Sequence, residues 1–280
     1  MKQRCLAIWA LWWGGGLVAA QTFDASAEMR KMIAAARSVQ TLRYELHKWE
    51  RIEGKMMHEK NIIKWRRSPF SVYIKIFEPQ TMEVLYVAGK NNGKALVNPG
   101  KFMPNLNLDP YGELMRRDQH HTIFATGFDY TVTLIEHSMN KYKDRAGEMH
   151  RYLGEETVHG RLCHKIELFN PNFRFVPYVV QSGENLTTIA RKLKVSEWLI
   201  LENNPSVKSY DDVSAGQTIK TPTDFSARTI LCIDKATHLP ASITVFDDKG
   251  LFEKYEYKNV VVNPNFKEEE FDEDYDEYGF

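Results

Sequence analysis

The first part of the chain alternates between apolar and polar residues with the period of β-strands, after one helical stretch. Residues 26–39 predict a helix because apolar side chains recur there at intervals of three or four. Strand-like runs follow at short spacing, separated by turn residues. These runs are residues 42–51, 57–66, 70–77, 83–87 and 94–98. The pattern predicts an antiparallel meander.

The second part of the chain repeats this organisation. A loop containing Pro and Asn, residues 99–114, leads to a predicted helical region over residues 121–143. Strands then resume on both sides of a segment of different character. These runs are residues 150–157, 161–169, 229–233, 241–246 and 251–257. About ten strands with two helices predict an α+β fold, in which a strongly curved antiparallel sheet wraps on helices.

Residues 178–222 interrupt the strands with a strand–helix–helix–strand order of their own. Val179 to Gln181 alternate as a strand, and Gly183 supplies a turn. Asn185 stands at the N-cap of a first helix, because its side-chain oxygen can accept a backbone amide of the first turn. Ser196 stands in the same position before a second helix, which Asn204-Pro205 ends. A unit of this size buries little core and is expected to be modestly stable.

This segment resembles a LysM module, the βααβ unit that binds N-acetylglucosamine-containing glycans such as peptidoglycan and chitin. The resemblance rests on an ordered set of residues from Tyr178 through Gly183 and Asn204-Pro205 to Pro222. In that family the glycan lies in a shallow groove between two loops, over an apolar floor to which Leu186 would belong. The resemblance thus implies glycan contacts from Gly183, Glu184, Asn185, Leu186, Thr187, Asn204, Pro205 and Ser206. The alternative is that several of these residues only build the fold.

The rest of the chain resembles the uncharacterised bacterial family called domain of unknown function 1571. The resemblance rests on residues 66–75, 83–89, 120–127, 160–168 and 231–240 and on the acidic ending. Members are similar to the LolA and LolB group of periplasmic lipoprotein carriers, an unclosed β-barrel with a helical plug that shelters acyl chains. This implies a LolA-like domain in two parts, residues 21–176 and 223–280, with the LysM unit, residues 177–222, inserted in a hairpin. It also implies a cavity lined by Val72, Ile74 and Ile76, for which an ordinary filled core is the alternative.

Residues 1–20 predict a cleaved secretory signal. Lys2 and Arg4 form a basic start, an apolar run follows, and small residues precede a cut at Gln21. The apolar run is too short to span a bilayer comfortably. The mature chain is therefore expected in the periplasm or exported to the cell envelope, and not spanning the membrane.

The charge pattern argues against a nucleic-acid partner. Loss of Lys2 and Arg4 leaves 35 of the 37 basic residues against 37 acidic ones, so the mature chain is close to neutral. Residues 267–280 hold eight acidic residues and one Lys. Such a segment is typical of a solvated end, or of one folded back on its own domain.

Two cysteines, Cys163 and Cys232, remain in the predicted mature chain. An even number in an oxidising compartment favours a disulfide. If Phe169 pairs with Ser226 at the base of the insertion, the antiparallel register places the two cysteines opposite each other. The sequence therefore predicts this disulfide.

No catalytic or cofactor motif stands out. The histidines fit no HExxH or comparable pattern, and the adjacent His120 and His121 are expected to point to different faces, which disfavours a metal site. Carboxylates on predicted strands, such as Glu50, leave a glycosidase pair open. The sequence favours a non-enzymatic envelope protein without a cofactor, which binds peptidoglycan through LysM and shelters a lipid, an acyl chain or a lipoprotein. A peptidoglycan-remodelling hydrolase, and a scaffold or stress-sensing subunit that binds a partner protein, are the alternatives.

Overall fold

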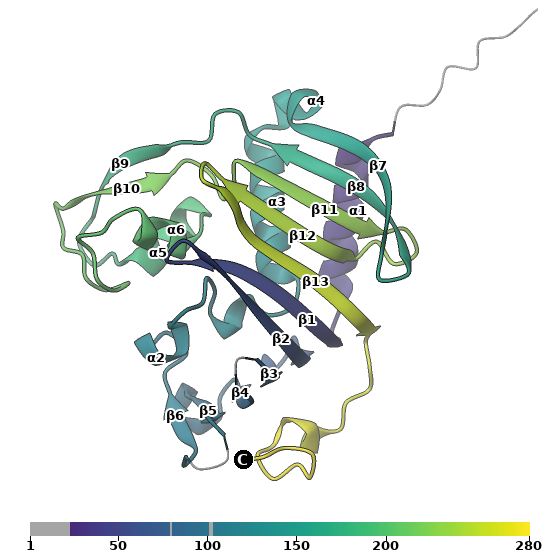
Figure 1. The fold of residues 1–280 in the computed structure, drawn as a ribbon, viewed down its shortest axis with the longest axis vertical. Helices are drawn as coiled ribbons and strands as arrows, with labels where there is room; N and C mark the ends of the chain where they lie inside the picture. The colour runs from purple at the N-terminus through teal and green to yellow at the C-terminus, as the bar shows by residue number, and fades with distance from the viewer. Residues whose placement is uncertain (1–22, 79, 101–102) are drawn as a thin grey trace, which may run out of the picture.

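The computed structural model describes residues 23–280 apart from residue 79 and residues 101–102, so the predicted signal, residues 1–20, and the cut at Gln21 lie outside it. One large antiparallel sheet dominates this part of the chain (Figure 1). Its strands are β1 (Thr41–Ile52), β2 (Lys55–Arg66), β3 (Ser71–Ile76), β4 (Met82–Val87), β5 (Ala95–Asn98), β6 (Leu106–Leu108), β7 (His150–Val158), β8 (Arg161–Phe169), β11 (Arg228–Asp234), β12 (Pro240–Asp247) and β13 (Gly250–Val262). Their order is β6-β5-β4-β3-β2-β1-β13-β12-β11-β8-β7, so the sheet is open at β6 and β7. The predicted meander is confirmed, and β6 forms within a segment expected to be a loop.

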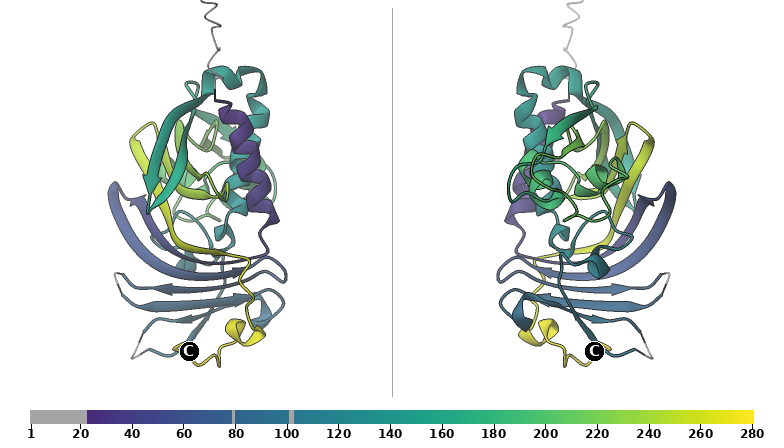
Figure 2. Two further views of the ribbon diagram at one scale, coloured as in Figure 1. Left: turned by 90° about the vertical axis from the view of Figure 1, so that its right-hand side faces the viewer. Right: turned by 90° about the vertical axis from the view of Figure 1, so that its left-hand side faces the viewer.

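Two long helices, α1 (Ala25–Ser38) and α3 (Asp129–Lys141), pack together and fill the curve of the sheet (Figure 2). The first is confirmed almost to the residue, and the Asp24 carboxylate caps it by accepting the Ala27 amide at 2.8 Å. The second helical region is shorter than predicted, because the chain turns at Gly127, which has a φ of 85°. The shorter helical pieces are α2 (Glu113–Arg116), α4 (Ala146–Met149), η1 (Asn91–Gly93), η2 (Ile123–Ala125), η3 (Lys143–Arg145) and η4 (Glu268–Phe271).

Both faces of the sheet are covered near β3. Val72, Ile74 and Ile76 face the helices and belong to the main core. Tyr73 faces the other way, into a second apolar cluster that contains Phe271 of the C-terminal segment. The acidic end is thus folded back on its own domain, where it lies against the outer face of the sheet (Figure 1).

A small βααβ unit is inserted between β8 and β11. It consists of β9 (Phe175–Val179), α5 (Leu186–Leu193), α6 (Glu197–Glu202) and β10 (Thr218–Pro222), and β9 pairs with β10. Both predicted N-caps are present: Asn185 Oδ1 accepts the Thr188 amide at 2.8 Å, and Ser196 Oγ accepts the Leu199 amide at 3.3 Å. The order of elements predicted for this segment is confirmed.

The predicted register at the base of this insertion is wrong by two residues. Phe169 pairs with Arg228 rather than Ser226, so Cys163 lies opposite Asp234 and Cys232 opposite Lys165. The connection into β11 is fixed by Asp224, whose carboxylate accepts the Asn170 side-chain amide at 2.7 Å. The cysteines share one face and a small buried cluster, but both thiols are free, and burial raises the pKa of Cys163 to about 11. The structure does not contain the predicted disulfide.

Within the described residues, no helix combines the length and the apolar character needed to cross a membrane.

Candidate functional site

The first predicted glycan loop of the inserted module contacts the connection between α6 and β10. Gly183 is exposed and has a φ of 78°, a conformation that favours glycine at a tight turn. Asn185 Nδ2 donates to Asp211 at 2.7 Å, and the Leu186 amide donates to the Tyr210 carbonyl at 2.8 Å. These bonds join the first loop to the segment between α6 and β10, which also carries the exposed Pro205 and Ser206.

Three of the predicted contact residues make contacts within the module itself. Leu186 is fully buried in the core of the module. Hydrogen bonds from Lys192 and from the Gln181 amide hold the pKa of Glu184 at about 2. Asn204 Nδ2 donates to the carbonyls of Ile200 and Lys220, which ties α6 to β10. Leu186 therefore offers no side-chain surface to a sugar.

Thr187 contacts the larger domain. Arg116 of α2 donates from Nη1 to Thr187 Oγ1 at 3.0 Å and pairs through Nη2 with Glu197 at 2.7 Å. Its guanidinium also lies 3.1 Å from the centroid of the Tyr210 ring. Arg116 of the larger domain thus packs against Thr187 of the first predicted glycan loop and against Tyr210.

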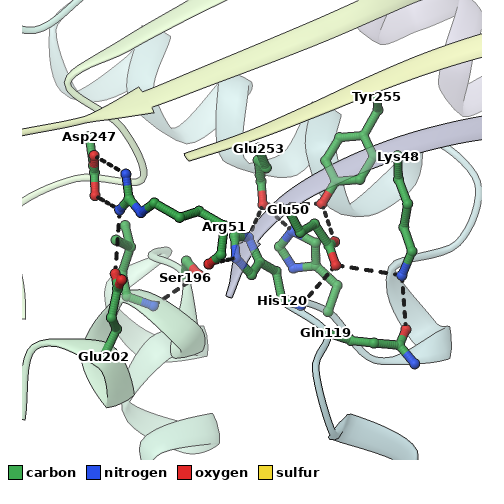
Figure 3. Close-up of polar contacts among 12 residues, drawn as sticks. Lys48, Glu50, Arg51, Gln119, His120, Ser196, Glu202, Asp247, Glu253 and Tyr255 are labelled. Carbon is green, nitrogen blue, oxygen red and sulfur yellow. Dashed lines mark hydrogen bonds and ion pairs between the residues drawn. The ribbon is translucent and has the colours of Figure 1, made fainter. Parts of the chain in front are cut away.

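The other side of the module is anchored in the larger domain. Leu199 of α6 is fully buried and belongs to the main core, whereas its neighbour Ile200, also fully buried, belongs to the core of the module. Trp198 stacks on the His120 ring, with centroids 5.5 Å apart. Arg51 of β1 pairs with both Glu202 of α6 and Asp247 (Figure 3). The module is therefore an integral part of the structure.

A cavity of about 100 Å³ lies between the sheet and the η2–α3 segment. Of the three predicted lining residues only Ile74 borders it, while Val72 and Ile76 are packed in the core. A second cavity, of about 310 Å³, lies between α3 and α5 and shares His121 and Tyr130 with the first. The cavities thus reach from the sheet interior to the inserted module.

Charged residues lie at one end of the smaller cavity. Figure 3 shows how several of them contact one another. His120 Nδ1 and His121 Nε2 lie 2.8 and 3.0 Å from the same oxygen, Glu253 Oε2. Tyr255 donates to Glu50 at 2.6 Å, and Lys48 Nζ lies 3.5 Å from the Glu50 carboxylate. The expectation that the two histidines point to different faces is wrong, because they lie in an irregular turn and not on a strand.

The carboxylates of this cluster are ionised despite their burial. Burial by itself would raise the pKa of Glu253, but His121 and His120 hold it at about 2. Burial likewise opposes ionisation of Glu50, while Lys48 and the histidines keep its pKa below the ordinary value. In turn, burial would lower the pKa of His121, but the Glu253 carboxylate raises it.

Comparison with known families identifies both parts of the chain. The model described as "Protein of unknown function (DUF1571)" matches residues 39–176 and 204–280. The chain belongs to the DUF1571 family. The LysM domain model matches residues 178–222. No curated protein matches the sequence.

The DUF1571 chain also resembles several solved structures distantly. The MucA/MucB complex of Pseudomonas aeruginosa is 12% identical, with a TM-score of 0.40, over 89% of this chain and 60% of that chain. The lipoprotein LppX of Mycobacterium tuberculosis is 11% identical, with a TM-score of 0.43, over 87% of this chain and 97% of that chain. A LolA superfamily protein of Nitrosomonas europaea is 9% identical, with a TM-score of 0.33, over 90% and 99% of the two chains.

Glu50, His120 and His121 are candidate site residues from the sequence, but Glu253 is not. Glu50 and Glu253 are directly opposite each other on β1 and β13. Like charges in that position destabilise a sheet unless something compensates for them. The cluster could have been predicted from the pairing of β1 with β13. Strand periodicity alone does not predict which strands pair.

Proposed function

We propose that this DUF1571 protein is a non-enzymatic, exported protein of the cell envelope that binds the N-acetylglucosamine glycan of peptidoglycan through its LysM domain. The observation that carries the proposal is the match of residues 178–222 to LysM, on a segment with the βααβ order whose first loop is bonded to the connection between α6 and β10. Gly183, Pro205 and Ser206 are exposed in this loop and this connection, so backbone groups there are accessible to acetamido groups.

The larger domain is proposed to shelter a lipid, an acyl chain or a lipoprotein segment. The cavities beneath the curved sheet support this, because apolar residues such as Ile63, Ile74 and Val245 line the smaller one. The larger cavity reaches the lower end of the size range of small-molecule pockets. Its position between α3 and α5 would bring a bound chain against the LysM domain.

A glycosidase mechanism is less well supported. Such an enzyme needs one carboxylic acid with a raised pKa to protonate the leaving group. Glu50 and Glu253 are the buried pair at the cavity, and the pKa of each is lowered. Neither carboxyl group is thus suited to act as the general acid near neutral pH.

The glycan proposal is tested with point variants of the full mature chain, because Leu199 anchors the module in the main core and a deletion would expose that core. Ser206→Trp places a bulky ring in the proposed groove, and Ser214→Trp makes the same change at an exposed position elsewhere in the same connection. Co-sedimentation with purified peptidoglycan sacculi should fall at least tenfold for S206W and stay unchanged for S214W. Equal pelleting of both variants, or no pelleting of the unaltered protein, would contradict the proposal.

The cavity proposal is tested by mass spectrometry of co-purified lipid and by titration with a hydrophobic fluorescent probe. Ile74→Trp fills the cavity, whereas Val261→Trp changes a half-exposed side chain on β13. A single saturable site should be weakened by I74W and not by V261W. A folded protein without lipid and without saturable probe binding would favour the scaffold alternative.

A further inference from the structure

We propose that Glu50, His120 and Glu253 form a binding site for one divalent transition-metal ion of the zinc class, at the polar end of the cavity. All three side chains are buried, with exposures of 4%, 1% and 1%. Each offers a ligand atom, and these atoms all lie within 4.8 Å of one another. One ion can therefore bind all three with small side-chain adjustments (Figure 3).

The His120 ring turns Nδ1 toward the Glu253 carboxylate and Nε2 toward the backbone. Nε2 lies 3.0 Å from the Arg51 carbonyl oxygen, which can only accept, so Nε2 carries a hydrogen. Nδ1 faces Glu253 Oε2 at 2.8 Å, so a proton on Nδ1 can join the two as a hydrogen bond. A metal ion bound to both atoms would take the place of that proton. A histidine ligand that donates its other N–H to a backbone carbonyl is the usual arrangement in metal sites.

The negative charges of Glu50 and Glu253 also favour binding of a cation. The carboxylates of Glu50 and Glu253 face each other across β1 and β13. Lys48, at 3.5 Å from Glu50, compensates for one of them. The second carboxylate accepts from the Tyr255 hydroxyl at 3.1 Å and lies beside the two histidines. A divalent ion bound to both carboxylates would neutralise the pair.

The mixture of ligands selects the class of ion. Ca²⁺ and Mg²⁺ prefer oxygen ligands, whereas this set includes an imidazole nitrogen. Two carboxylates and an imidazole suit zinc and its neighbours among the divalent transition metals. His121, whose Nε2 lies 3.0 Å from Glu253 Oε2, would orient that carboxylate from outside.

The site would keep one position open. Glu50 and Glu253 border the cavity, as does His121. Three protein ligands and a free fourth position are typical of zinc sites that bind a further group. The polar end of the cavity would thus hold a water or an anionic group of a cavity ligand on the metal.

The test uses the full mature protein, freed of metal with a chelator and titrated with ZnCl₂ in a calorimeter. We expect one tight equivalent per chain, and Co²⁺ should give a visible absorption band at the same stoichiometry. His120→Gln and Glu253→Gln should weaken binding at least 100-fold, and His121→Gln about 10- to 100-fold. His159→Gln is the matched control, because His159 lies 2.8 Å from Glu256 in a partly exposed pair.

X-ray absorption on the unaltered protein keeps the test decisive if a variant does not fold. The expected first shell has nitrogen and oxygen atoms only, including one imidazole. Absence of a tight equivalent in the unaltered protein overturns the proposal. So does a shell without imidazole, or equal loss of affinity in H159Q and H120Q.

Discussion

Two segments of this DUF1571 protein dock on the same curved sheet in different ways. The LysM insertion has a buried core of its own, from Val180 to Ile219, and adds one anchor, Leu199, to the core of the larger domain. The C-terminal segment has no separate core, because Phe271 packs only in a cluster whose other buried members belong to the sheet. An insertion can thus be at once a folded unit and a part of its host, whereas the tail depends on the sheet for its structure.

The largest effects are expected in α6, where the neighbouring residues Leu199 and Ile200 pack in two different cores. Leu199→Ala and Ile200→Ala each remove a fully buried side chain from a core, and each should cost about 3 kcal/mol of the unfolding free energy. L199A should loosen the contact between module and host, while I200A should destabilise the module itself. Hydrogen exchange distinguishes the two effects: L199A should speed exchange around His120 and β13, and I200A in α5 and β10. Identical exchange patterns would mean that the two cores are one.

Loss of Phe271, the main anchor of the tail, should lower the free energy of unfolding less than either substitution in α6. Phe271 is 1% exposed and lies under the Arg66 guanidinium, 4.6 Å from the ring centroid. Phe271→Ala should cost about 2 kcal/mol, below the usual value for a buried Phe, because detachment of the tail limits the loss. Limited proteolysis should then cleave residues 263–280 while the LysM domain stays protected. Joint loss of tail and module protection would contradict independent docking.

The sequence reveals elements better than it reveals contacts between them. The helix at 25–38, the long strands and the two N-caps of the LysM unit follow from local periodicity and capping. The register of β8 with β11 does not, because it depends on the contact of Asn170 with Asp224, 54 residues away in sequence. The Glu50–Glu253 pair and the anchoring role of Leu199 were missed for the same reason, since each joins segments far apart in the chain.

Loss of a single ion pair of the tail should have a smaller effect on stability. This effect should be larger for a buried pair than for an exposed one. Lys64, with a side chain 8% exposed, pairs with Glu270 at 2.9 Å and lies 4.6 Å from the Tyr275 ring centroid. Lys64→Gln should weaken tail docking by about 1 kcal/mol. Lys90 pairs with Asp272 at 3.4 Å, but both side chains are largely exposed. Lys90→Gln is the matched control and should cost less than about 0.5 kcal/mol, as measured by thermal unfolding.

The smallest expected effect is the pH dependence of tail docking through Glu270. Burial would raise the pKa of this carboxyl group, but hydrogen bonds from Lys64 and the Lys267 amide hold it below its ordinary value of 4.5. A carboxyl group whose pKa is lower in the folded state stabilises that state above its unfolded pKa, and this contribution is lost as the pH falls through the folded value. Tail protection in hydrogen exchange should therefore be constant from pH 7 to pH 5 and decrease below pH 4.5. Glu270→Gln should weaken docking at neutral pH and flatten this decrease, whereas an unchanged acid profile in E270Q would assign the effect to other carboxylates of the tail. The LysM domain is held to the larger domain by the apolar contact of Leu199 as well as by the Arg51–Glu202 and Arg116–Glu197 pairs, so its protection should decrease less than that of the tail over the same pH range.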